Sequence, residues 1–199
     1  KISVLPTLLV SQVGIIPDVR QALTTDFKQP GDLLFLMGGT RDELRGSVYD
    51  RCYGGGRHGP RVLPKAALAV YRAVHCAARS GCVASCHDLA DGGLAVALAE
   101  CAIGGRLGAH VQIEHVAAPA RIFTTALLFG ESPSRLLVSV PRERLEQFRA
   151  LIDGVDGAEI GVVTDDGRLS LKRHRRLVLR AQVAELTAAW STGPAGDGV

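Results

Sequence analysis

The sequence predicts an α/β protein of the α+β layered kind, with a mixed sheet of five or six strands flanked by helices. One observation is the alternation of short apolar segments, bounded by turn residues, with longer segments of helical periodicity. Another is the composition: 47% of the residues are hydrophobic but only 5% are aromatic, which predicts an aliphatic, alanine-rich core. The 199 residues fit one ordinary domain with a fragment of a second, and are enough for a real core.

Charge and hydropathy argue against two classes of partner. The net charge is only +3, and the arginines are scattered except in the run from Lys172 to Arg176. A solvated turn or strand edge is preferred there over a phosphate contact, and no interleaved aromatic residues indicate a nucleic-acid surface. No apolar run approaches the roughly 20 residues of a membrane span, and no signal peptide is visible.

The cysteines favour neither a disulfide framework nor a zinc site. Their count is odd, and no paired Cys-x-x-Cys spacing occurs. Four of them are expected to be small buried apolar residues, and reduced thiols indicate the cytoplasm. These four are Cys76, Cys82, Cys86 and Cys101.

The N-terminal part predicts strands and a turn. Residues 2–16 are apolar and predict one or two strands, and residues 18–30 predict a polar connection that leads into a turn at 29–32. Residues 33–37 predict a buried strand, and a capping-box pattern at 40–44 predicts a single helical turn. Because the chain begins without methionine in a strand-like segment, we expect it to be a piece of a longer protein.

A glycine-rich region follows at residues 45–47 and 52–60. It could cradle a phosphate, but it lacks the Lys-Ser/Thr ending of a P-loop and does not lie between a clear strand and helix. A flexible surface loop is therefore preferred. Pro64 and the spacing of apolar residues then predict a helix over 64–79, which ends at Gly81.

The central stretch, residues 83–105, predicts a short buried strand, a polar turn and a helix. Asp91 is expected to be the N-cap residue of the helix, while Gly92 and Gly93 allow a sharp turn or a close approach. A strand end that leads into a glycine turn and a helix N-terminus suits anion binding, because free N–H groups and the helix dipole point there.

His87 and Asp88 stand where this strand would end, and two interpretations stay open. The pair can fix the turn through hydrogen bonds, or it can face a substrate and do acid–base or electrostatic work. Spacing alone favours the first interpretation.

The next elements are shorter. Residues 108–113 predict a strand with His110 and His115 near its ends, both expected at the surface because neither has a partner at metal-ligand spacing. Three further segments predict a helix, a strand and an amphipathic helix, at 121–129, 136–140 and 142–152.

The loop between the first two of these segments is the second place where chemistry could lie. Ser132, Ser134 and Arg135, with exposed N–H groups, can surround a phosphate or carboxylate. Alternatively, Glu131 and Arg135 pair with each other and tie the loop to the following strand.

The C-terminal part predicts a hairpin and a helix. Residues 158–164 and 169–172 alternate around a turn at 165–168, which is a hairpin signal. A last helix is expected over 178–190, followed by a disordered glycine- and proline-bearing tail at 191–199.

Three segments resemble phosphoribosylformylglycinamidine synthase, the amidotransferase synthetase of purine biosynthesis. Residues 87–100 resemble its His-Asp-x-Ser-Asp-Gly-Gly-Leu signature, although Ala90 replaces the serine. Residues 128–135 are similar to its Glu-Ser-x-x-Arg loop, and residues 6–19 provide a third match. The matches follow the family's order, but Arg45 stands where the family usually has the first glycine of Gly-Gly-Ser.

The resemblance implies a domain organisation. Residues 1–30 would be a stub and linker of the preceding nucleotide-binding lobe. Residues 31–190 would form a domain like the C-terminal domain of aminoimidazole ribonucleotide synthetase, with residues 191–199 as the tail.

The resemblance also implies a function for the whole enzyme, a ligase that uses ATP, magnesium and ammonia from glutamine to convert formylglycinamide ribonucleotide into the amidine. Its partners would be the remaining lobes, a glutaminase subunit or domain and the phosphoribosyl substrate. The fragment alone is expected to be inactive, with no catalytic residue and no metal ligand assigned. The residues expected at a substrate or phosphate site, intact or vestigial, are Glu131, Ser132, Ser134, Arg135, His87, Asp88, Asp91, Gly92 and Gly93.

Two alternatives remain. The chain could belong to a sister enzyme of the same superfamily, such as aminoimidazole ribonucleotide synthetase, selenophosphate synthase or thiamine-phosphate kinase. It could instead be a non-catalytic docking module, whose sign would be a wide apolar face left exposed.

Overall fold

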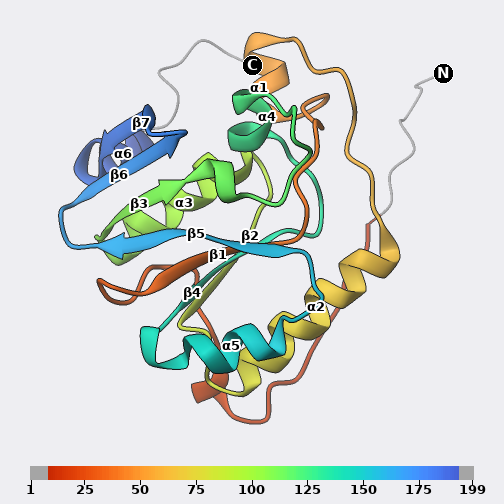
Figure 1. Ribbon diagram of the computed structural model, residues 1–199, viewed down its shortest axis with the longest axis vertical. Coiled ribbons are helices and arrows are strands. Elements are labelled where there is room, and N and C mark those ends of the chain that lie inside the picture. The colour runs from red at the N-terminus through yellow and green to blue at the C-terminus, as the bar shows by residue number, and fades with distance from the viewer. Residues whose placement is uncertain (1–8, 193–199) are drawn as a thin grey trace.

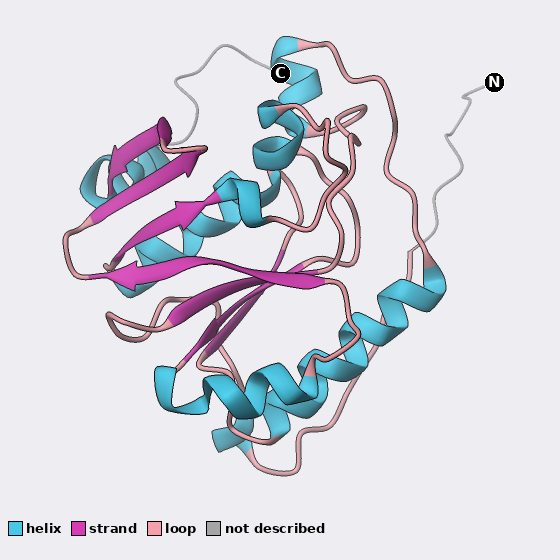
Figure 2. Ribbon diagram, in the orientation of Figure 1, coloured by secondary structure: helices cyan, strands magenta, loops and turns pink. Residues whose placement is uncertain are grey.

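A computed structural model describes residues 9–192 and shows one seven-stranded sheet with helices on both faces (Figures 1 and 2). The strand order is β2-β4-β1-β5-β3-β6-β7. All neighbours are antiparallel except β3 and β6, which are parallel. The predicted mixed sheet is confirmed, with seven strands instead of five or six. The strands are β1 (Leu33–Met37), β2 (Ser85–Asp88), β3 (Gly108–Gln112), β4 (Leu136–Val140), β5 (Gly157–Thr164), β6 (Arg168–Arg173) and β7 (Arg176–Gln182).

The helices divide between the two faces of the sheet. Helices α2 and α5 cover one face, and α3 and α6 lie on the other with α4 beside them (Figure 1). The α-helices are α1 (Val48–Tyr53), α2 (Pro64–Arg79), α3 (Gly93–Gly105), α4 (Thr124–Phe129), α5 (Leu145–Leu151) and α6 (Val183–Thr192). Three short 3-10 helices are η1 (Val19–Gln21), η2 (Ile113–His115) and η3 (Arg142–Arg144).

Each face has its own apolar core because successive strand residues point to opposite sides. In β1, Leu34 and Leu36 pack under α3, whereas Leu33, Phe35 and Met37 pack under α2 and α5. All five residues of this central strand are buried. Helix α3 is buried over most of its circumference, since its alanines let the sheet, α4 and α6 approach closely.

Two expectations for the N-terminal part are wrong. Residues 9–16 form no strand, and the remainder of that predicted segment lies outside the described residues. Residues 40–44 form no helical turn, because the Thr40 N–H donates to the Ala117 carbonyl instead of a local partner. The helical turns come later, in α1, where Ser47 accepts from the Asp50 N–H as the N-cap residue.

The predicted hairpin between β5 and β6 is also wrong. The turn exists, but β3 lies between the two strands and pairs with both. The true hairpin joins β6 to β7 through His174 and Arg175, whose φ angles are 48° and 66°. The basic run is therefore a strand end and a turn, as preferred from the sequence.

The last helix begins later than predicted. Residues 178–182 belong to β7, and α6 extends to Thr192, two residues into the predicted tail. Residues 193–199 lie outside the described residues.

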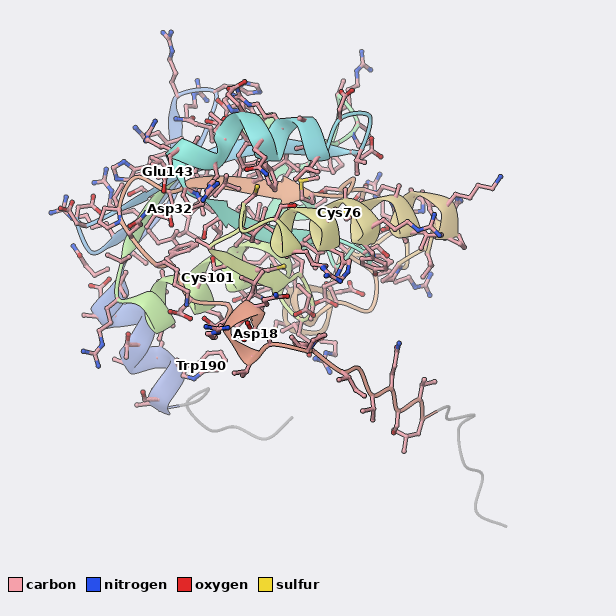
Figure 3. The ribbon with its side chains drawn as sticks, turned by 90° about the horizontal axis from the view of Figure 1, so that it is seen from below. Asp18, Asp32, Cys76, Cys101, Glu143 and Trp190 are labelled. Carbon is pink, nitrogen blue, oxygen red and sulfur yellow. The ribbon has the colours of Figure 1, made fainter. Side chains whose placement is uncertain are left out.

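Cys82 and Cys101 are buried, as predicted, and Cys86 is partly buried. Burial raises the pKa of Cys101 to about 12 and that of Cys86 to about 11, so both thiols stay protonated at neutral pH. Cys76 is exposed, contrary to expectation, because it lies on the outer side of α2 (Figure 3). Within residues 9–192, the structure has no helix that combines the length and apolar character needed to cross a bilayer.

Candidate functional site

Strand pairing brings the sequence motifs to one edge of the sheet. The last residue of β1, Met37, and the last residue of β2, Asp88, both lie opposite Leu136, the first residue of β4. Because β4 runs antiparallel to its two neighbours, the loops at these strand ends meet. We call this place the strand-edge site; its loops are residues 38–40, 87–93 and 130–135.

Two glycines let these loops touch backbone to backbone. Gly38 has φ +89°, and a Cβ there would lie 2.6 Å from the Ser134 carbonyl oxygen. Gly93 has φ +64°, and a Cβ there would lie 2.5 Å from the Gly130 carbonyl oxygen. The close approach predicted for Gly93 is confirmed, and the loop before β4 is held between these two contacts.

The position expected for an anion holds a carboxylate of the chain itself. Glu131 Oε1 accepts from the Gly92 N–H at 2.8 Å and from the Val48 N–H at 2.9 Å, at the starts of α3 and α1. The anion preference of the helix N-terminus is thus met internally. Asp91 does not cap α3, because the N-cap residue is Gly92, which has no side chain to accept.

Arg135 is enclosed by its own loop and is 1% exposed. Its Nε donates to the Ser132 carbonyl at 2.8 Å, its Nη1 to Thr40 Oγ1 at 3.1 Å, and its Nη2 to the Gly130 carbonyl at 2.5 Å. Burial lowers the pKa of Arg135 to about 10. The guanidinium does not pair with Glu131 in the described residues, and its donors are used by its own loop and by Thr40.

Ser132 is likewise part of the scaffold. It is fully buried, and its Oγ accepts from the Arg41 N–H at 3.1 Å. The loop before β4 is therefore fixed to the loop after β1 by side chains that the sequence presented as ligand groups.

His87 joins β2 to α3. Its Nε2 lies 2.9 Å from Glu100 Oε2, and its Nδ1 lies 2.6 Å from the Asp88 carbonyl oxygen. The imidazole is 14% exposed, and its close partners are a side chain of α3 and a backbone carbonyl rather than the Asp88 carboxylate, whose Oδ1 lies 3.6 Å from Nδ1. Asp88 has a 73% exposed side chain and Asp91 is exposed, so both carboxylates reach solvent.

Ser134 is the hydroxyl residue of the loop that reaches the surface. It has φ +64°, and its Oγ accepts from the Tyr71 hydroxyl of α2 at 3.0 Å. A small cavity of about 30 Å³ lies beside it, lined by Arg41 and Asp156 among others. Tyr71, Arg41 and Asp156 were not predicted as site residues from the sequence. Of the three, only Arg41 carried a signal, because it lies two residues after the glycine pair that follows β1.

The described residues offer no set of donors that suits magnesium. Within the described range, no group of three or more histidine, cysteine or acidic side chains is arranged to hold a metal ion. Asp88 and Asp91 reach solvent, but they do not form a site by themselves.

The family model described as AIR synthase related protein, C-terminal domain, matches residues 29–174. The chain belongs to this family. Solved structures share the fold: phosphoribosylformylglycinamidine synthase II from Thermotoga maritima has a TM-score of 0.72 at 19% identity, over 84% of this chain and 28% of that one. T. maritima PurL complexed with FGAR has a TM-score of 0.75 at 19% identity, over 84% and 30%.

A hydrogenase maturation protein, HypE in complex with ATP, is also similar, with a TM-score of 0.57 and 19% identity over 84% of this chain and 56% of that one. The two T. maritima synthase structures are much longer than this chain, which spans less than a third of their length. At this identity the similarity establishes the fold.

Proposed function

We propose that the chain is the C-terminal lobe of an ATP-dependent synthetase of the phosphoribosylformylglycinamidine synthase type. The whole enzyme would convert formylglycinamide ribonucleotide into the amidine with ATP and ammonia from glutamine, and magnesium would be held by its other lobes. The observation that carries the proposal is the meeting of the His-Asp and Glu-Ser motif loops, with the loop after β1 (residues 38–40), at one sheet edge. The overall fold similarity to the T. maritima synthase structures supports the proposal.

Within this lobe, the strand-edge site would contact a phosphate-bearing substrate through Ser134 and Arg41. Arg41 is partly exposed and lines the same small cavity as Ser134. A hydroxyl and a guanidinium are suitable donors to phosphate oxygens. Asp88 and Asp91 would accept from ribose hydroxyls, while Glu131, Ser132, Arg135, His87, Gly92 and Gly93 hold the loops in shape.

Calorimetric titration with ADP and then with ribose 5-phosphate tests this site. Ser134→Gly removes the hydroxyl and suits the positive φ, and we expect it to weaken ribose 5-phosphate binding at least tenfold. Tyr71→Phe, which removes only the partner of that hydroxyl, should weaken binding by a smaller factor. Tyr53→Phe, at a 78% exposed tyrosine, is the matched control. Equal binding by wild type and Ser134→Gly would refute the assignment.

We expect the 199-residue chain alone to release no phosphate from ATP. Phosphoryl transfer needs bound magnesium and positioned phosphates, and the described residues contain no group of metal-ligating side chains. A phosphate-release assay with ATP and magnesium checks this. Turnover by the pure chain would overturn the assignment of catalysis to other lobes and favour a complete sister enzyme.

A docking role is the second candidate. Residues 9–16 present large apolar side chains to solvent, including Val13 and Ile15, each 92% exposed. Surfaces of this kind mark contacts with other protein parts. If no nucleotide or phosphate compound binds at the strand-edge site while the chain stays folded, this role is preferred.

A further inference from the structure

On the face of the sheet that α2 and α5 cover, strands β3, β6 and β7 contribute no described residue to the apolar core, which includes residues of β1, β4 and β5. The other face of β3, β6 and β7 packs on α3 and α6 through Val111, Leu171 and Leu179. We call the first face of these three strands the open face, and its side chains are therefore free to serve another purpose.

Strand register gathers polar side chains on this open face. His110 of β3 lies opposite Ser170 of β6, which lies opposite Arg180 of β7. Gln112 lies opposite Lys172, two residues further on, and so shares the same face. Together with Asp166 and Arg168 they line a cavity of about 240 Å³. We call it the open-face cavity.

The cavity carries excess positive charge. Within residues 9–192, the side chains of Arg168, Lys172 and Arg180 take part in no ion pair or hydrogen bond. Its one carboxylate, Asp166, is already occupied: it accepts from the Thr164 hydroxyl at 2.7 Å and the Arg168 N–H at 3.1 Å, and its Oδ2 lies 3.0 Å from His110 Nε2. Gathered like charges repel one another, so a bound anion would relieve this repulsion.

A hydroxyl without a partner points to the same ligand class. Ser170 is 6% exposed, lines the cavity, and forms no side-chain hydrogen bond with another described residue. The Ser170 hydroxyl therefore remains available to donate a hydrogen bond to an oxygen-rich ligand in the cavity. The amide of Gln112 adds a further donor.

We propose that the open-face cavity binds the phosphate group of a small molecule. Arg168, Lys172 and Arg180 would supply charge, and Ser170 and Gln112 would supply hydrogen bonds. The recessed volume is that of a small ligand. A polypeptide would instead need a broad surface. This site is separate from the strand-edge site and does not depend on the proposed function.

Calorimetric titration of the 199-residue chain at low salt tests the proposal, with inorganic phosphate and ribose 5-phosphate as separate probes. The double variant Lys172→Gln/Arg180→Gln should weaken binding of inorganic phosphate at least tenfold, and Ser170→Ala should weaken it several-fold. Arg79→Gln/Arg144→Gln removes the same charge from exposed positions elsewhere and should leave binding unchanged. Circular dichroism melts confirm that each variant is folded.

The two probes distinguish a phosphorylated metabolite from inorganic phosphate, and the variants distinguish the open-face cavity from the strand-edge site. Tighter binding of ribose 5-phosphate than of inorganic phosphate assigns the cavity to a phosphorylated metabolite, and equal binding assigns it to phosphate itself. Both probes are therefore also titrated in a Ser134→Gly background, where the strand-edge contact is removed, and the further loss caused by Lys172→Gln/Arg180→Gln in that background belongs to the open-face cavity alone. Unaltered binding by the double variant overturns the proposal. So does binding of poly-glutamate without phosphate, which would indicate an acidic protein partner.

Discussion

Arg135 is a residue whose type indicates anion binding but whose surroundings give it a structural task. Its guanidinium is buried among oxygens of Gly130, Ser132 and Thr40, and no carboxylate pairs with it in the described part of the chain. Arg135→Met keeps much of the volume but leaves these acceptors without donors. We expect a loss of about 3 kcal/mol in the free energy of unfolding, measured by urea denaturation. Arg144→Met, at an exposed arginine, should change it by less than about 0.5 kcal/mol. A loss below about 1 kcal/mol for Arg135→Met would show that the loop is held by other contacts.

Asp32 is a buried carboxyl with an electrostatic cost. It is 1% exposed, its Oδ1 accepts from Gln29 at 3.1 Å, and its Oδ2 has no partner among the described groups. Figure 3 shows Glu143 beside it. Burial, with a smaller effect of Glu143, raises the pKa of the Asp32 carboxyl above its ordinary value of 3.8. The folded chain therefore binds this proton more tightly than the unfolded chain, and stability is lost as the pH rises from about 4 through the raised pKa.

Asp32→Asn removes the free-energy cost of burying an ionised carboxyl at this position. We expect its melting temperature at pH 7 to exceed that of the wild type by roughly 2–4 °C, the shift that accompanies about 1 kcal/mol in a domain of this size. The advantage should shrink towards pH 3.5, where the carboxyl is protonated in both states. Asp153→Asn, at an exposed position, serves as the control in thermal melts across this range. A difference that does not vary with pH would mean that charge is not its cause.

At the scale of elements, the strand-edge site depends on how closely the end of β1 approaches the loop before β4. Gly38→Ala places a Cβ 2.6 Å from a backbone oxygen and forces alanine to φ +89°. We expect a loss of about 2–3 kcal/mol by urea denaturation. Gly154→Ala, where φ is +71° and nothing lies within 4 Å, isolates the cost of φ alone at about 1 kcal/mol. Equal losses in the two variants would show that the loops can separate without penalty.

Elements with strong local patterns were predictable, and elements set by distant partners were not. Helix α2 has the predicted bounds because Pro64 and its apolar periodicity are local signals. Residues 178–182 favour a helix by composition, yet they form edge strand β7 because β6 offers a ladder of hydrogen bonds. The β5–β6 turn was visible, but nothing near it in the sequence shows that β3 enters between the two strands.

At the scale of the whole molecule, the sequence motifs meet at one edge of the sheet, but their spacing did not show which contacts each residue would make. Spacing within the sequence favoured a His-Asp pair that fixes a turn, but it could not show that His87 would reach Glu100 of α3. It could not show that Glu131 would reach the starts of two helices, since Val48 and Gly92 are 83 and 39 residues away. Nor could it show the open-face cavity, whose residues come from three strands that only the sheet order brings together.

The segment of residues 9–16 leads to a prediction about the molecule as a whole. In Figure 3 it extends away from the body, and Val13 and Ile15 are each 92% exposed. If these side chains contribute to docking and not to the core, Val13→Ser/Ile15→Ser should change the melting temperature by less than about 2 °C, because such surface substitutions are nearly neutral. The variant should also bind less of an apolar dye such as ANS.

Leu36→Ala serves as a destabilising control. Leu36 is fully buried in the central strand, so its truncation should lower the free energy of unfolding by about 2–5 kcal/mol. A large loss of stability in the serine double variant would mean that this segment packs on the domain in solution, and the docking role would then lose its main support. An unchanged melt with weaker dye binding would instead leave these side chains available to a neighbouring lobe. Crosslinking from residues 9–16 in the proposed synthetase would then locate the contact.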